Sequence, residues 1–134
     1  MILLNTIKRE LDALGIKPKK SLGQNFLINE GVYKKIIAAL DIKKDDIIVE
    51  VGPGLGTLTG YLAESKAEII AVEKDKKLAI YLKNKFSNRK SVKIIEGDIL
   101  KFNPGNYQLH TANYKLVGNI PYYLTSRLIR TVFE

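Results

Sequence analysis

The segment Asn119-Ile120-Pro121-Tyr122 combines residue types that could act together on the amino group of a nucleobase. An amide oxygen and nearby backbone carbonyls can accept hydrogen bonds from an exocyclic amine, and an aromatic ring can stack on a flat base. The segment follows an apolar run, Tyr114 to Gly118, that predicts a short buried strand. The simpler alternative is an ordinary strand-end turn with a half-buried tyrosine. If the segment does hold a base, another part of the chain must supply a group donor.

A glycine-rich loop, Gly52-Pro53-Gly54-Leu55-Gly56, joins an apolar run to a helical pattern. Glycine lets the backbone turn sharply and approach a ligand closely. The spacing is Gly-x-Gly-x-Gly, which differs from the Gly-x-Gly-x-x-Gly of dinucleotide sites. It suits a nucleoside with a small zwitterionic tail better than a pyrophosphate. Without other signals, a merely tight strand-to-helix turn explains the loop equally well.

Two acidic residues end the next two predicted strands. Glu73 could accept both hydroxyls of a ribose, as acidic residues do in dinucleotide folds. Asp98, which follows Gly97, could accept the amino group of an adenine. The alternatives are a solvated acid paired with Lys74 or Lys76, and an Asx-type turn cap at Asp98.

The elements that must position these residues alternate along the chain. Apolar runs in which polar and apolar residues do not alternate predict strands that are buried on both faces. The helical patterns between these runs predict parallel pairing in a doubly wound α/β sheet. Ligands of such sheets bind beyond the carboxyl ends of the strands, where all the candidate residues fall. The predicted strands are 47–51, 69–72, 92–95 and 114–118, and the predicted helices are 2–14, 29–40, 57–65, 75–86 and 124–133.

Composition narrows the function classes. The chain has 134 residues, which bounds it to one domain, and a net charge of +8. The charge favours a polyanionic partner such as nucleic acid, although a lysine-rich surface that is simply solvated would give the same balance. There is no cysteine and a single histidine, so disulfides and thiolate or histidine metal clusters are excluded. No apolar run approaches the length of a membrane span.

The glycine loop and the strand-end carboxylates resemble those of class I S-adenosylmethionine-dependent methyltransferases. Asn119 to Tyr122 is similar to the Asp/Asn-Pro-Pro-Tyr signature of the amino-methyltransferases, with isoleucine second as in the rRNA adenine N6 subgroup. Lys20 to Leu27, Lys-Ser-Leu-Gly-Gln-Asn-Phe-Leu, resembles the N-terminal motif of the same subgroup. Over essentially its whole length the chain therefore resembles the rRNA adenine N6,N6-dimethyltransferase family, most closely its bacterial KsgA branch.

The Erm-type resistance methyltransferases, which act on large-subunit rRNA, are the close alternative within this family. Ser-Leu-Gly before Gln24, Gly52-Pro53-Gly54 and the Tyr122-Tyr123 pair favour the ribosome-biogenesis branch. Arg127 departs from the proline that relatives often carry after Thr-Ser, and we interpret it as an ordinary helix residue.

The resemblance implies a Rossmann-like fold, S-adenosylmethionine as cofactor, and dimethylation of adenosines in small-subunit rRNA in the cytoplasm. It places the ribose on Glu73, the adenine near Asp98 and the methionine part over Gly52 to Gly54. The implied cofactor-binding residues are Asn25, Leu27, Gly52, Gly54, Glu73, Lys74, Asp98, Ile99 and Asn119, and the implied catalytic residues are Asn119, Pro121 and Tyr122.

The resemblance also predicts an incomplete domain. Residues 1–40 would form an N-terminal helical extension and residues 41–134 a nucleotide-binding core, truncated after about four parallel strands and without the helical domain of the family. The last strand would be an apolar edge, which favours self-association. Alternatives are therefore a module that binds S-adenosylmethionine without turnover, and a protein that binds RNA through its lysines alone.

Overall fold

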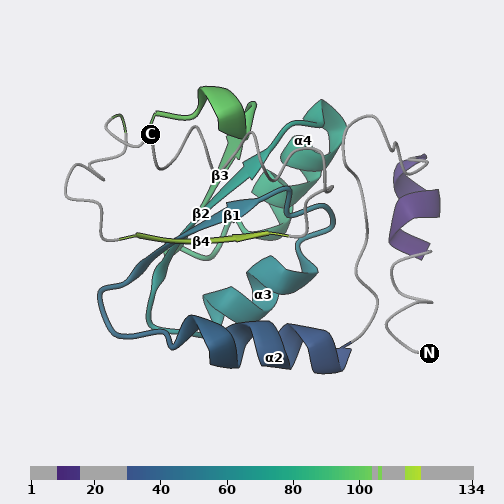
Figure 1. The fold of residues 1–134 in the computed structure, drawn as a ribbon. Coiled ribbons are helices and arrows are strands. Elements are labelled where there is room, and N and C mark those ends of the chain that lie inside the picture. The colour runs from purple at the N-terminus through teal and green to yellow at the C-terminus, as the bar shows by residue number, and fades with distance from the viewer. Residues whose placement is uncertain (1–8, 16–29, 104–105, 107–113, 119–134) are drawn as a thin grey trace.

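The computed structural model describes residues 9–15, 30–103, 106 and 114–118 (Figure 1). Residues 9–14 are helical, and we call them the N-terminal helical segment. The other elements are α2 (Glu30–Leu40), β1 (Ile47–Val51), α3 (Thr57–Ala63), β2 (Glu68–Glu73), α4 (Lys76–Lys85), β3 (Val92–Glu96), the 3-10 helix η2 (Ile99–Lys101) and β4 (Tyr114–Gly118). No helix within these described ranges is long and apolar enough to cross a membrane.

The four strands form one parallel sheet in the order β3-β2-β1-β4. The predicted parallel α/β sheet is thereby confirmed. β1 lies between β2 and β4, with Val51 opposite Val72 on one side and Gly118 on the other. The carboxyl ends of β1, β2 and β4 consequently meet at one end of the sheet.

Alternate strand residues supply two apolar clusters. Ile48 and Ile69 pack with Tyr33 of α2 and Leu58 of α3, and these two helices run together along that face of the sheet (Figure 1). Val49, Val51, Ile70 and Val72 form the second cluster, with Ile99 of η2. Successive strand side chains point to opposite faces, so the two clusters lie on opposite sides of β1 and β2. Burial on both faces explains why these strands are apolar apart from Glu50 and the two ends of β2.

Within the described residues the helix ends lie within one residue of the predictions except after α3, whereas the predicted helix start at residue 2 and the predicted cap at Asn29 lie outside those residues. Asp75 caps α4, because its side chain accepts a hydrogen bond from the Leu78 backbone at 3.1 Å. The prediction that the preceding helix continues to Ser65 is wrong, since α3 ends at Ala63. The Ser65 hydroxyl donates to the Leu62 carbonyl and accepts from the Ala67 backbone N–H. These bonds satisfy backbone groups of the turn, so the helix is not extended. The predicted helix over 124–133 lies outside the described residues.

Lys115 of β4, the outer strand of the sheet within the described residues, holds the end of α2. Its Nζ donates to the carbonyls of Leu40 at 2.7 Å and Asp41 at 2.8 Å, and to Asp46 Oδ2 at 2.9 Å. A lysine at the carboxyl end of a helix satisfies carbonyls that have no partner within the helix. This contact ties β4 to the helix layer across a long stretch of sequence.

Candidate functional site

The glycine loop connects β1 to α3 through backbone that only glycine adopts readily. Gly52, Gly54 and Gly56 have φ angles of 63°, 61° and 81°. At Gly56 the left-handed conformation is matched by a close approach, since an added Cβ would lie 2.7 Å from the Phe86 ring and 2.8 Å from Leu82. Gly52, by contrast, is exposed and has open space where a side chain would be. The loop is thus packed tightly at its helix end and accessible at its strand end.

Glu73 fixes this loop from the neighbouring strand. Its Oε1 accepts from the Gly54 backbone N–H at 3.0 Å, and its Oε2 accepts from the Asp75 backbone N–H at 2.9 Å. The residue is 4% exposed, so the alternative of a solvated acid paired with a lysine is wrong. Burial raises the pKa of the Glu73 carboxyl, and the hydrogen bonds from Asp75 and Gly54 oppose that rise. Glu73 is therefore a buried acceptor that faces the glycine loop.

Asp98 is a turn cap, and its second oxygen faces a lysine. Oδ1 accepts from the Leu100 backbone at 3.0 Å and begins η2, as the Asx-cap alternative predicts. Oδ2 lies 3.8 Å from Lys74 Nζ. The cap does not exclude a ligand role, since a carboxylate offers about four acceptor positions. It does fix the direction in which the carboxylate points.

Six of the predicted site residues come together at the carboxyl ends of β1, β2 and β3. The Gly52 N–H donates to the Val72 carbonyl at 2.9 Å, and the Gly97 N–H donates to the Glu73 carbonyl at 2.9 Å, so the three strand ends are joined directly. The Ile99 side chain packs into the apolar cluster on the sheet, so any contact it makes with a cofactor would come from its backbone. The six are Gly52, Gly54, Glu73, Lys74, Asp98 and Ile99, whereas Asn25, Leu27, Asn119, Pro121 and Tyr122 lie outside the described residues.

Two residues that sequence reasoning did not select also shape this end of the sheet. Gly118 ends β4 opposite Val51, and a Cβ there would lie 2.6 Å from the Val51 carbonyl oxygen. Only glycine therefore lets β4 approach β1 so closely immediately before Asn119. Glu50 lies two residues before the glycine loop, and its Oε2 accepts from the Thr59 hydroxyl at 2.6 Å. The sequence signal that could have selected Glu50 is that it is the single acid within the apolar strand Ile-Ile-Val-Glu-Val.

Burial of Glu50 is nearly complete. The residue is 2% exposed, and burial raises the pKa of its carboxyl to about 7; the Thr59 hydrogen bond opposes the rise and the nearby Glu73 charge adds to it. Burial chiefly raises the pKa of Tyr33 in α2, and the charge of the Glu50 carboxylate adds to that rise. Glu50 thus joins β1 to α3 on either side of the glycine loop.

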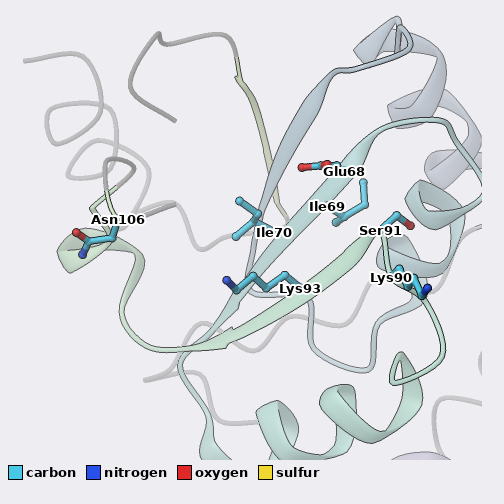
Figure 2. A pocket seen from close by; sticks show the side chains of 7 residues that line it. All are labelled: Glu68, Ile69, Ile70, Lys90, Ser91, Lys93 and Asn106. Carbon is cyan, nitrogen blue, oxygen red and sulfur yellow. The ribbon is translucent and has the colours of Figure 1, made fainter. Parts of the chain in front are cut away.

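A cavity of about 390 Å³ lies at the opposite end of the sheet (Figure 2). It is bounded by the start of β2 and by β3 with the turn that precedes it. Since the candidate residues follow the carboxyl ends of the strands, this cavity is separate from them. Its lining residues are Glu68, Ile69, Ile70, Lys90, Ser91, Lys93 and Asn106.

A parallel sheet in this order, with its candidate residues at the carboxyl ends, defines a Rossmann-like domain of the methyltransferase class. Solved structures agree. The 23S rRNA methyltransferase ErmE matches 82% of this chain and 43% of its own, with 29% identity and a TM-score of 0.71. A dimethyladenosine transferase from Plasmodium falciparum matches 81% of this chain and 38% of its own, with 29% identity and a TM-score of 0.69.

The chain belongs to the ribosomal RNA adenine dimethylase family, whose sequence model matches residues 15–134. The ribosomal RNA small subunit methyltransferase A of Dehalococcoides mccartyi is 43% identical over 132 residues, or 98% of this chain. The protein of the same name from Borreliella burgdorferi is 39% identical over 132 residues. The chain spans 45% and 46% of the lengths of these two relatives.

Proposed function

We propose that the glycine loop, Glu73 and Asp98 bind S-adenosylmethionine, and that the chain serves methyl transfer to N6 of adenosines in small-subunit rRNA. The buried Glu73 carboxylate that faces Gly54 is the observation that carries this proposal. Its two oxygens accept from the Gly54 and Asp75 backbone N–H groups and the Lys74 N–H also interacts with the carboxylate, and since a carboxylate offers about four acceptor positions, capacity remains for ribose hydroxyl donors. The exposed, left-handed Gly52 leaves room for the methionine part beside the loop.

The residues have separate tasks in the proposed reaction. S-adenosylmethionine supplies a methyl group on a positively charged sulfur when it is bound. Glu73 and Asp98 hold its nucleoside, and the motif around Asn25 and Leu27 covers its methionine end. The carboxylates thereby fix the position of the methyl group, and positioning of this kind lowers reaction barriers substantially.

Asn119 to Tyr122 is assigned to the base that accepts the methyl group. Adenine N6 is a weak nucleophile because its lone pair is delocalised into the ring, so the base must leave its stack and be oriented. The Asn119 side-chain oxygen and the Ile120 or Pro121 carbonyl accept the two N6 protons, contacts that strengthen as charge develops on the nitrogen. Tyr122 stacks on the adenine, a contact that contributes about 1–3 kcal/mol, and Phe26 covers its other face.

Calorimetry with S-adenosylmethionine tests the cofactor part of the proposal. Glu73→Gln replaces a charged acceptor with a weaker one and is expected to lower cofactor affinity by about tenfold or more. Glu68→Gln is the matched control, because it removes the same charge from the exposed first residue of the same strand. Wild-type affinity in a folded Glu73→Gln protein would contradict the assignment of Glu73.

Methyl transfer to immature ribosomal subunits tests the substrate. We expect transfer to small rather than large subunits, since the small subunit relatives are more similar in sequence than ErmE. Asn119→Ala is expected to lower kcat far more than cofactor affinity, because Asn119 acts mainly on the base. Cofactor binding without transfer to either subunit would support the alternative of a binding module. Because the proposed substrate is small-subunit rRNA, we also propose that the reaction takes place in the cytoplasm.

We also propose one methyltransferase domain over residues 1–134, with an N-terminal extension at 1–40 and the α/β core at 41–134. Within the described residues β4 pairs with β1 alone, so its other side is an edge that a second copy of the chain could pair with. Sedimentation velocity over a range of protein concentrations tests this self-association. A monomer at every concentration would contradict it.

A further inference from the structure

Lys85 of α4 contacts the glycine loop one residue after the position that Glu73 contacts. It lies in the last turn of α4, and its Nζ donates to the Leu55 carbonyl at 2.8 Å. Leu55 stands between Gly54 and Gly56 and is 2% exposed. A hydrogen bond from a charged donor is stronger than one between neutral groups. Gly54 and Leu55 are consecutive residues, so adjacent backbone groups of the loop are held by charged side chains from β2 and α4.

The same ammonium group faces the N-terminal helical segment. Lys85 Nζ lies 3.9 Å from Glu10 Oε2, with both side chains about one third exposed at 32% and 29%. It also lies 5.5 Å from the centre of the Tyr81 ring and 5.9 Å from that of Phe86. Burial, followed by a hydrogen bond with Glu10, raises the pKa of Tyr81 to about 12, and the Tyr81 hydroxyl donates to Glu10.

Apolar contacts run parallel to this polar network. Leu11 of the N-terminal helical segment is buried with Leu55 of the loop and Leu78 of α4, and Leu14 packs against them. Phe86 and Leu82 of α4 fill the space beside Gly56. The glycine loop is thus enclosed on its buried side by the N-terminal helical segment and α4.

We propose that Lys85 is a positioning residue for the glycine loop, and that Glu10 links the loop through Lys85 to the N-terminal helical segment. This inference rests on the proposed function of the loop as the cofactor site. Lys85 does not touch the cofactor; it sets the backbone that does. Any change in the docking of residues 9–14 therefore alters the loop, and cofactor binding favours the docked arrangement in return.

The first experiment measures the loop without cofactor. Amide hydrogen exchange at Gly54 and Gly56, which donate to Glu73 and to the Pro53 carbonyl, is expected to become several-fold faster in Lys85→Met. Lys83→Met is the matched control, since it removes an exposed lysine from the same last turn and the same favourable charge at the helix end. Equal exchange in both variants would overturn the proposal, whether or not the chain binds S-adenosylmethionine.

The second experiment measures cofactor binding by calorimetry. Lys85→Met is expected to weaken S-adenosylmethionine binding by about threefold to tenfold, because the loss is a part of what one charged hydrogen bond contributes. Lys83→Met is expected to leave the affinity for S-adenosylmethionine unchanged. Lys85→Arg keeps a charged donor and is expected to recover most of the loss. If the wild-type chain does not bind the cofactor, the proposed function fails, and the exchange experiment still decides the role of Lys85.

A double-mutant cycle tests the link to the N-terminal helical segment. Glu10→Gln alone is expected to speed loop exchange slightly, and the combination with Lys85→Met is expected to add little to Lys85→Met. Independent, additive effects of the two changes would refute the link. If Lys85→Met does not fold, loop exchange in Glu10→Gln compared with the wild type still tests the link, and unchanged exchange would refute it.

Discussion

Replacement of Glu50 by glutamine should change how the stability of this protein depends on pH. The buried carboxyl has an ordinary pKa of 4.5 and a pKa of about 7 in the fold, so folding favours its protonated form. The stability associated with protonated Glu50 is fully present below pH 4.5 and is lost as the pH rises through 7. Glutamine keeps an acceptor for Thr59 and cannot ionise, so the variant should not show this loss.

The gap between the two pKa values sets the size of the effect. At about 1.4 kcal/mol per pH unit, it corresponds to a loss of about 3 kcal/mol in the wild type between pH 4 and pH 8.5. A new amide N–H₂ without a partner could cost about 1–3 kcal/mol, but that cost is the same at both pH values. Glu73 and Tyr33 also respond to the Glu50 charge, so the difference between the proteins includes their smaller contributions.

Urea unfolding followed by circular dichroism, repeated from pH 4 to pH 8.5, is the assay. The expected result is a free-energy difference between Glu50→Gln and the wild type that shifts by about 3 kcal/mol in favour of the variant as the pH rises. Glu68→Gln serves as the control, because Glu68 is exposed at the start of β2. A difference that stays constant over this range would show that Glu50 is not held protonated by burial, and the reasoning would be wrong.

Two further substitutions test how β4 is held. Gly118→Ala is expected to lower the free energy of unfolding by about 1–3 kcal/mol, because its Cβ would lie 2.6 Å from the Val51 carbonyl oxygen. Gly60→Ala is the control, because Gly60 lies inside α3 with open space around it, and this change is expected to raise the free energy of unfolding by up to about 1 kcal/mol. Similar effects of Gly118→Ala and Gly60→Ala in denaturant unfolding would contradict the predicted clash at Gly118. Lys115→Met is expected to cost about 1–2 kcal/mol through the unpaired carbonyls that end α2, whereas Lys43→Met should have little effect. The hydrogen bond between Lys115 and Asp46 also lowers the pKa of Asp46, so the stability that it contributes is present at neutral pH and is lost in acid. A destabilisation by Lys115→Met that does not shrink in acid would contradict this reasoning.

Much of the fold could be predicted because local signals and global arrangement agree. The strands β1 and β2 are apolar apart from Glu50 and the two glutamates that end β2, and such runs without polar alternation are what burial on both faces favours. Asp75 follows a strand and precedes a helical pattern, and it caps α4 as its type predicts. The boundary after α3 was missed because a serine hydroxyl that bonds the backbone competes with helix continuation, and the apolar pattern does not show that competition.

The candidate site, like the fold, was predicted in part from the sequence. The residue types and their order along the chain determined which side chains lie at the strand ends, because parallel strands joined by helices place their carboxyl ends together. The sequence left both alternatives open for Glu73 and for Asp98. The structure decided that Glu73 is buried against Gly54 and that Asp98 caps η2.

The sequence by itself therefore determined the class of sheet, the position of the glycine loop and the family. Only the tertiary structure decided what surrounds the loop. Thr59 contacts Glu50, Lys85 contacts Leu55 and Glu10, and Val51 contacts Gly118, and each contact joins residues of different elements. Periodicity reports which face of an element is buried, but it carries no information about which partner on another element fills that space.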